Sequence, residues 1–309
     1  MGPPVVRHIL RRLLTVPLTL LLVSFVAFVV LRVTGNPVEI FLDINATEEQ
    51  RQLLMARLHL DQPLPVQFAL FIGDVLQGDF GVSLQFGSQA MPVVIERLGA
   101  TVQLVSVALS IALVVGVGAG IVAAIWKDSF ADFAISALAV AGQSMPSFWL
   151  GILLIQLFAL QLKWLPTSGT GGLEHLVLPA VTLATFLLPN FILITRAAML
   201  ETVHELYVTT ARSKGASEAV VMLRHVLPNA VNPVLSFLGL QMGRLMGGSI
   251  ITEAIFAWPG IGSLMIKSIS QRDVPIVIAG IFIMAIAIVL ANLIVDLLQS
   301  VVDPRIRMD

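Results

Sequence analysis

Residues 101–125 read TVQLVSVALSIALVVGVGAGIVAAI, a continuous apolar run without a charged side chain. A transmembrane α-helix needs about 20 consecutive apolar residues to cross a hydrocarbon core about 30 Å thick. Because the backbone polar groups of a segment in lipid must be satisfied internally, such a run is expected to cross as an α-helix. This stretch therefore predicts a transmembrane helix.

Further apolar runs of similar length lie on both sides of this one. Together they predict an all-α fold, a bundle of six transmembrane helices. Two of the runs contain Pro146 and Pro189, which remove a backbone hydrogen bond and are expected to kink their helices. In chain order, the predicted spans are residues 13–31, 101–125, 133–160, 176–199, 233–252 and 275–298.

The composition agrees with a membrane protein. Of the 309 residues, 57% are hydrophobic and 12% are charged, whereas soluble domains carry about 25% charged residues. This apolar composition makes membrane lipid the expected surroundings. The net charge of −1 gives no reason to expect a nucleic-acid partner. Cysteine is absent, so no disulfide can hold the external loops and no thiolate can act as nucleophile or metal ligand.

Basic residues predict how the bundle is oriented. Arg7, Arg11 and Arg12 precede the first span, Arg305 and Arg307 follow the last, and others lie between the fourth and fifth spans. If there are six spans, all three groups fall on one side, which the positive-inside rule assigns to the cytoplasm. Both termini are therefore expected in the cytoplasm, with the chain in a prokaryotic inner membrane. The first run is longer than a signal-peptide core and lacks a cleavage pattern after it, so we expect a retained anchor.

The spans and the polar stretches between them divide the chain into three parts. Residues 1–31 are predicted to be a cytoplasmic N-terminus and first transmembrane anchor, and residues 32–99 an external amphipathic cap. Residues 100–309 are predicted to be a core of five transmembrane helices with a cytoplasmic insertion. The cap is expected to be helical, because Thr47 and Gln50 form a capping-box pattern before apolar residues at helical spacing.

The sequence shows no motif for an energy source or an enzyme. A phosphate-binding loop places a lysine directly after a glycine, and none of the four lysines follows one. His204 and Glu205 begin a zinc-protease pattern, but Val208 stands where its second histidine belongs, and no Gly-x-Ser-x-Gly occurs. The five histidines are scattered and indicate no metal site. We therefore expect a transport subunit that is not an enzyme and binds no cofactor or metal.

The polar residues of the spans also carry information about energy coupling. Ion-coupled carriers usually place ionisable groups near the middle of the membrane. The predicted spans have no carboxylate there. Their polar residues are mainly Gln103, Gln143, Gln156, Asn190, Asn232, Gln241, Arg244 and Asn292. A polar-lined bundle without its own energy source is expected to use one that another protein supplies.

A polar insertion at about residues 200–228 lies between the fourth and fifth predicted spans, on the cytoplasmic side. Its centre, residues 207–218, reads YVTTARSKGASE. Gly215 favours the left-handed conformation that ends a helix, and Ser217 can cap a following one. We therefore expect a helix-turn-helix on the inner surface.

This insertion resembles the coupling motif of ABC importer permeases, Glu-Ala-Ala-x-x-x-Gly followed after nine residues by Ile-x-Leu-Pro. Matching positions are Ala211, Gly215, Leu227 and Pro228, and departures are Thr209, Thr210 and His225. Strings elsewhere are similar to the B-type permeases of the dipeptide, oligopeptide and nickel branch of this family. They lie at residues 60–65, 78–83, 146–149, 165–169, 256–260 and 303–305. Their joint order over the chain carries the resemblance.

The resemblance implies a type I ABC importer permease that pairs with a homologous permease, two ATPase subunits and an external substrate-binding protein. ATP and Mg²⁺ would be bound by the ATPase subunits, on which the insertion would dock. The solute would be a dipeptide or oligopeptide. The residues expected to couple to the ATPase are Thr209, Thr210, Ala211, Arg212, Ser213, Lys214, Gly215, Ala216, Ser217, Glu218, Leu227 and Pro228.

Four residues are candidates for the translocation path. Arg244 is the most unusual, because an arginine at the centre of a membrane helix costs about 2.5–3.5 kcal/mol. We expect it either to attract the C-terminal carboxylate of a peptide or to pair with a group of this or another subunit. Glu253 is placed where it could meet a peptide's ammonium group. Gln241 and Asn190 complete the set.

Glycines at four-residue spacing predict close helix contacts. Gly116 and Gly120 form one such set, and Gly239, Gly243 and Gly247 form another. Small residues let helices approach closely, so both faces are expected to be packing seams. The alternative for the second set is a seam against the partner permease that slides during transport.

Other functions stay open at this point. With the same architecture, the solute could be a nickel chelate or glutathione. From different classes, the alternatives are a self-sufficient channel, an ion-coupled carrier and an intramembrane enzyme. The coupling string disfavours the channel and the carrier, and the missing catalytic motifs disfavour the enzyme.

Overall fold

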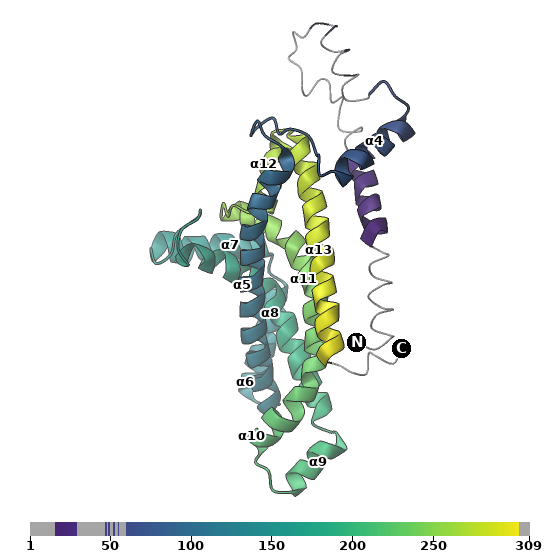
Figure 1. Ribbon diagram of the computed structural model, residues 1–309. Helices are drawn as coiled ribbons and strands as arrows, with labels where there is room; N and C mark the ends of the chain where they lie inside the picture. Colours follow the sequence, from purple (N-terminus) through teal and green to yellow (C-terminus); the bar gives the residue numbers. More distant parts are fainter. Residues whose placement is uncertain are drawn as a thin grey trace.

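Long α-helices make up the fold, which is drawn in Figure 1. The computed structural model describes residues 16–29, 47, 49, 52, 55 and 60–302, without the side chains of residues 242 and 295–302. Within this part of the chain there is no strand, only an isolated bridge between Val82 and Gln89. The basic residues at the two termini lie outside the described residues, and so does Gln50 of the predicted capping box.

The helices follow one another with short connections, after a first helix at Val16–Val29. Two segments, η1 and η2, are π-helical. The bounds are α4 Leu64–Leu76, α5 Ala90–Ile125, α6 Phe130–Gln143, α7 Ser147–Leu154, η1 Ile155–Gln161, α8 Glu174–Thr202, α9 Leu206–Ser213, α10 Glu218–Val220, η2 Val221–Val226, α11 Leu227–Ile255, α12 Ile261–Ser270 and α13 Val274–Val302.

The described helices place most of the predicted spans. By length and composition, three can cross a membrane, namely α5, α8 and α13. Two further pairs of helical segments are bent at a short break, and the number rises to five if each pair is counted as one span. One pair is α6 with α7 and η1, and the other is Glu218–Gln241 with Gly243–Ile255. The first predicted span is described only at Val16–Val29. The count of six and the orientation of the termini therefore stay predictions.

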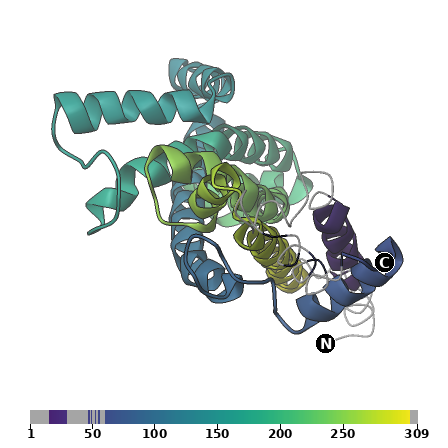
Figure 2. The ribbon, with the colours of Figure 1, turned by 90° about the horizontal axis from the view of Figure 1, so that it is seen from above.

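Pro146 breaks its span rather than kinking it, which corrects the sequence-based expectation. The segments before and after the break, Phe130–Gln143 and Ser147–Gln161, meet at 105°. Pro146 has extended backbone (φ −61°, ψ 129°) and begins α7, as expected for a residue that cannot donate to the preceding turn. α7 and η1 therefore leave the bundle sideways (Figures 1 and 2). In contrast, α8 continues as one helix through Pro179 and Pro189.

The α5–α8 contact depends on two glycines. A Cβ atom at Gly116 would lie 2.6 Å from Cβ of Phe191, and one at Gly120 would lie 2.7 Å from the carbonyl oxygen of Ile192. Both are closer than real Cβ contacts, so only glycine permits this approach. The first predicted glycine seam is therefore confirmed as packing within the chain.

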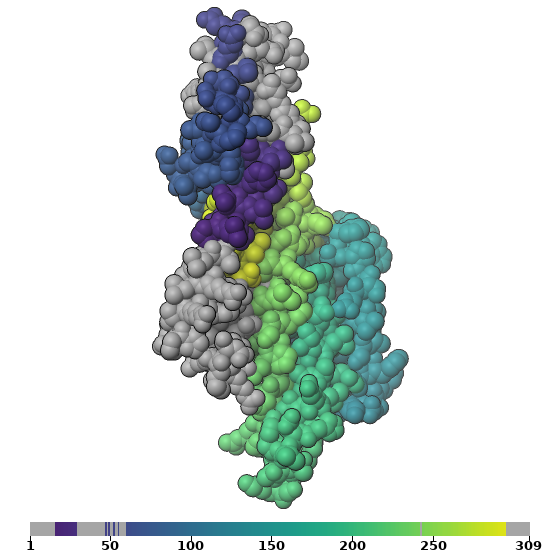
Figure 3. Space-filling model, turned by 90° about the vertical axis from the view of Figure 1, so that its right-hand side faces the viewer, coloured from purple at the N-terminus to yellow at the C-terminus, as the bar shows by residue number. Residues whose placement is uncertain are grey.

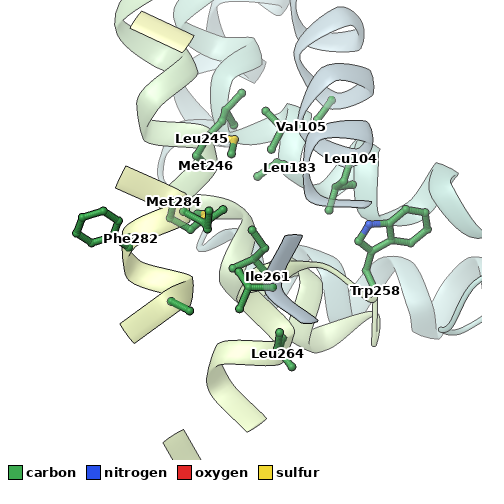
Figure 4. Packing of buried hydrophobic residues seen from close by; sticks show 14 of the residues in the cluster. Leu104, Val105, Leu183, Leu245, Met246, Trp258, Ile261, Leu264, Phe282 and Met284 are labelled. Carbon is green, nitrogen blue, oxygen red and sulfur yellow. The ribbon is translucent and has the colours of Figure 1, made fainter. Parts of the chain in front are cut away.

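One large hydrophobic cluster, here called the main core, joins α5, α8, α11, α12 and α13 (Figure 4). Leu104, Leu183, Leu245 and Ile261 represent the first four of these helices, and all are nearly or fully buried. Phe191 of α8 adds an edge-to-face ring contact with Phe237 of α11, at 5.1 Å between centroids. The main core thus holds the three unbroken spans together.

A buried carboxylate fixes the short helix α12, which the sequence did not predict. Glu253 is fully buried, and its Oε1 accepts hydrogen bonds from Oγ1 of Thr101 (2.8 Å) and Oγ of Ser249 (3.2 Å). Its Oε2 accepts one from the backbone N–H of Ser263 (3.1 Å), in the first turn of α12. An acceptor at this end of a helix satisfies N–H groups that have no partner within the helix. Glu253 therefore joins α5, α11 and α12.

The opposite end of α12 is tied to the polar loop before α5. Asp273 is nearly fully buried between α12 and α13, and its Oδ2 accepts hydrogen bonds from Oγ of Ser83 and from the backbone N–H of Gln85 (3.2 Å). Phe80 from the same loop packs on Phe282 of α13, with ring centroids 5.4 Å apart. The predicted cap region is thus attached to the core by polar and aromatic contacts, without a disulfide.

We predict that Gly120→Ala destabilises the protein, because the new methyl group would press on the Ile192 carbonyl oxygen at 2.7 Å. Such overpacking typically costs about 1–3 kcal/mol. Gly118→Ala is the matched control on the same helix, since no atom lies within 4 Å of its Cβ position. The measurement is the thermal unfolding midpoint of each purified variant in detergent. Equal midpoints for the two variants would contradict the proposed seam.

Candidate coupling surface and translocation path

The insertion between α8 and α11 is a helix-turn-helix, as the sequence predicts. α9 ends at Ser213, and Gly215 adopts a left-handed backbone with φ +81°. The N–H of Gly215 donates to the carbonyl of Arg212 (2.9 Å), and the N–H of Ala216 donates to that of Ala211 (3.3 Å). These two bonds form a Schellman motif, the usual way to end a helix at a glycine.

The second helix of the insertion starts without the predicted cap. Ser217 occupies the N-cap position before α10, but its side chain makes no capping hydrogen bond. Arg212 instead forms two hydrogen bonds with the Glu218 carboxylate across the turn, Nη2 to Oε1 at 2.5 Å and Nε to Oε2 at 3.1 Å. These bonds raise the pKa of Arg212 above its ordinary value. Because the pair is exposed, it contributes at most about 1 kcal/mol and mainly orients the two side chains.

A second hydrophobic cluster, here called the inner core, anchors the insertion to the spans. It contains Val208 of α9, Val221 of η2, Met199 of α8, Ala124 of α5 and Ala230 of α11, all of them buried. Packed interiors resist deformation, so a displacement of α9 must be shared by the ends of α5, α8 and α11. The insertion is therefore a rigid extension of the bundle.

The outer surface of the insertion forms the lower tip of the molecule in Figure 3. Of the residues predicted to couple to an ATPase, Ala211 is buried in the inner core, and Ala216 and Leu227 are half-buried against it. Apolar Leu206, 85% exposed, stands at the start of α9. The exposed members are Thr209, Thr210, Arg212, Ser213, Lys214, Gly215, Ser217, Glu218 and Pro228. The structure thus gathers most of the predicted set on one protruding surface.

The four path candidates do not converge on one cavity. Arg244 lies on an exposed face of α11, followed by exposed Gly247 and Gly248. Among the described residues, no group forms a hydrogen bond or ion pair with it. Gln241 is buried, 3% exposed, on the same helix. Glu253 is fully buried in the contact with Thr101, Ser249 and α12, so this carboxylate has no exposed surface in the chain and its contacts give it a structural role.

The second glycine seam is divided between two environments. A Cβ atom at Gly243 would lie 3.2 Å from Cγ2 of Ile288, so this position packs on α13 within the chain. A Cβ atom at Gly247 would meet no atom within 4 Å. Among the described residues, the seam is therefore packed at Gly243 and open at Gly247.

Asn190 lines a pocket at the break between α6 and α7. The pocket has a volume of about 270 Å³, and Nε2 of Gln143 donates to Oδ1 of Asn190 across it at 2.8 Å. No charged side chain is among the residues that line it. These residues are Gly142, Gln143, Met145, Ser147, Leu150, Thr185, Phe186 and Asn190. The sequence shows Gln143 as a polar residue of a predicted span, but it does not show that Gln143 lines a pocket, because the pocket is formed by the break between α6 and α7.

An ion pair links the other end of α6 to α8. Nε and Nη2 of Arg196 donate to Oδ1 and Oδ2 of Asp132, at 2.6 and 2.7 Å. Asp132 also accepts from the backbone N–H of Asp128 (3.0 Å) and from Oγ of Ser136 (3.3 Å). Its side chain is only 6% exposed, and that of Arg196 is 27% exposed. No local pattern marks Asp132 in the sequence, because the two partners stand 64 positions apart.

In the part of the chain that is described, no three His, Cys, Asp or Glu side chains gather where they could hold a metal ion.

We predict that Arg196→Met lowers stability by about 2–4 kcal/mol, because it leaves the buried Asp132 carboxylate without its counter-charge. Adding Asp132→Asn should restore much of the loss, since no unpaired charge then stays buried. Arg212→Met is the control, because its ion pair is exposed and worth about 0–1 kcal/mol. The free energy of unfolding is measured for Arg196→Met, Asp132→Asn, the double variant and Arg212→Met, and the first three form a double-mutant cycle with wild type. A double variant no more stable than Arg196→Met alone would argue against the pair.

Two sequence-family profiles together match nearly the whole chain. "Binding-protein-dependent transport system inner membrane component" matches residues 116–308. "Binding-prot-dependent transport system membrane comp, N-term" matches residues 5–105.

Individual relatives of known name are also transport system permeases. The chain is 38% identical over 301 residues to the glutathione transport system permease protein GsiC of Escherichia coli K12, covering 97% of this chain and 98% of the relative. The GsiC protein of Shigella dysenteriae serotype 1 matches to the same extent.

Solved structures are similar in fold at low identity. The MetNI methionine ABC transporter in an inward-facing conformation matches with a TM-score of 0.59 and 18% identity, over 69% of this chain and 97% of that one. An amino acid ABC transporter solved with histidines matches with a TM-score of 0.52 and 21% identity, over 69% and 94%. The chain therefore belongs to the family of binding-protein-dependent transport system inner membrane components, the multi-pass permease subunits of ABC importers.

Proposed function

We propose that this chain, with a homologous second permease, forms the translocation pathway for dipeptides or oligopeptides, and that two ATPase subunits drive it through the helix-turn-helix at residues 206–226. The observation that carries the proposal is this protruding insertion, whose inner face is fixed to three spans by the inner core. A partner that moves the tip must move the ends of α5, α8 and α11 with it.

The docking surface suits a groove in another protein. Leu206 and Val220 offer exposed apolar area, and Arg212, Lys214 and Glu218 offer charged groups around it. Interfaces commonly combine an apolar centre with a polar rim. ATP and Mg²⁺ then belong to the ATPase subunits, and an external binding protein delivers the solute to the opposite side, as in other importers of this family.

The similarity to glutathione permeases supports the proposed substrate class. The GsiC proteins that are 38% identical to this chain transport glutathione, which is itself a small peptide. Glutathione is therefore the second candidate within the same class, and nickel chelates are the third. The described spans contain no metal-binding group of side chains that would favour a metal chelate. Transport without ATPase subunits would instead indicate a channel or an ion-coupled carrier.

We predict that Gly215→Val uncouples ATP hydrolysis from transport. A β-branched residue is strained at φ +81°, at a cost of about 1–2 kcal/mol, so the docking turn would be displaced. Uptake per ATP hydrolysed should fall about 5- to 30-fold in proteoliposomes that contain the whole complex. Gly215→Asn is the control, because asparagine tolerates this backbone conformation. Normal coupling in a well-assembled Gly215→Val complex would contradict the docking role.

A substrate panel tests the peptide assignment and the part that Arg244 plays in it. Proteoliposomes with the complete transporter should take up dipeptides and tripeptides only when ATP is supplied. Arg244→Ala should lower uptake of peptides with a free C-terminal carboxylate about tenfold more than uptake of their amides, since charge-assisted hydrogen bonds contribute about 1.5–3 kcal/mol. Equal losses for acids and amides, with the complex at normal abundance, would reject carboxylate recognition. If the transporter takes up glutathione but none of the other peptides, glutathione would replace dipeptides and oligopeptides as the assigned substrate.

A further inference from the structure

The pocket at the α6–α7 break presents an unused pair of amide groups. Gln143 and Asn190 are bonded to each other through Nε2 and Oδ1, at 2.8 Å. Among the described residues, no group donates to Oε1 of Gln143 and none accepts from Nδ2 of Asn190. The pair therefore leaves the Oε1 acceptor of Gln143 and the Nδ2 donor group of Asn190 unused at the same place.

The walls around this pair are neutral. Met145, Leu150 and Phe186 supply apolar surface, and the hydroxyl of Thr185 is already used in donating to the carbonyl of Thr182 at 2.7 Å. Phe186 and Met145 are both more than one-third exposed, so the described residues do not close the pocket. A charged group would find no counter-charge in this lining, whereas an uncharged polar group would be satisfied.

A peptide bond has the complementary pattern, because its N–H donates and its C=O accepts within one planar unit. Resting on the proposed function, we propose that this pocket is a subsite for a backbone peptide group of the transported solute. Oε1 of Gln143 accepts from the solute N–H, and Nδ2 of Asn190 donates to a solute C=O. Recognition of the backbone, next to apolar walls, admits many side chains.

The helices hold the two amides at a fixed separation. In α8, Pro189 precedes Asn190. The Cγ atom of Pro189 would lie 3.6 Å from a Cβ atom at Gly142, the residue directly before Gln143. The Asp132–Arg196 ion pair joins the same two helices farther along. A pre-arranged pair of this kind binds without the cost of ordering the side chains first.

The test uses a peptide and its ester analogue in proteoliposomes that contain the complete transporter. Tri-alanine is compared with the depsipeptide in which one peptide N–H is replaced by oxygen, because the ester keeps the shape and removes the donor. In Gln143→Met, the preference for the peptide over the ester should fall about 3- to 10-fold relative to wild type, as expected for one hydrogen bond. The external binding protein contributes equally to both ratios, so the change reports on the permease.

Gln156→Met is the matched control, since Gln156 is exposed on η1 and does not line the pocket. It should leave the ratio unchanged. Equal losses of peptide and ester uptake in Gln143→Met, or no loss of either, would overturn the subsite. A wild-type complex that hydrolyses ATP but takes up no peptide would refute the proposed function and this subsite with it.

The cysteine-free sequence allows a second readout. A single Met145→Cys substitution places one thiol in the pocket wall, where a maleimide should label it in the assembled complex. Tri-alanine should slow labelling about 3-fold or more, and the depsipeptide should slow it less. A thiol that stays unlabelled in the complex would show that another subunit covers the pocket, and this would overturn the proposal.

Discussion

The buried carboxylate of Glu253 is the interaction on which the arrangement of the spans depends. A carboxylate in an apolar bundle is tolerated only if its oxygens are hydrogen-bonded. Thr101, Ser249 and Ser263 supply those bonds from α5, α11 and α12. Gly260 and Gly262 leave room for it, since a Cβ atom at either would overlap the carboxylate. The main core then packs around a junction whose polar groups are already paired.

The two hydrophobic clusters have different roles: the main core holds the spans together, and the inner core connects the spans to the insertion. The main core gathers α5, α8, α11, α12 and α13, and the inner core gathers the lower ends of the first three with α9 and η2. Two of these three helices, α5 and α11, thus run from the inner core beneath the candidate docking surface to the junction at Glu253. Dense packing in both clusters is the physical reason that a force on the insertion is carried along whole helices and not absorbed locally.

The breaks and bends of the spans shape the surfaces that face a solute or a second permease. The 105° turn at Pro146 opens the pocket at Gln143 and Asn190, and it directs α7 away from the bundle. The open face of α11 carries Arg244 near Gly247, where none of the described residues comes within 4 Å of a Cβ atom built at Gly247. These surfaces are incomplete in one chain, which agrees with a protein that works in an assembly.

The sequence by itself determined most of the spans and the turn of the insertion. Apolar runs fixed most of the spans, because lipid leaves the backbone few alternatives to a helix, and Gly215 gave the turn of the insertion, because a left-handed residue favours glycine. Tertiary structure alone decided the rest. Glu253 forms a buried link between α5, α11 and α12, Pro146 stands at a break, and Gln143 meets Asn190, because each outcome depends on contacts between residues far apart in the chain. Such contacts follow from packing, which no local pattern records.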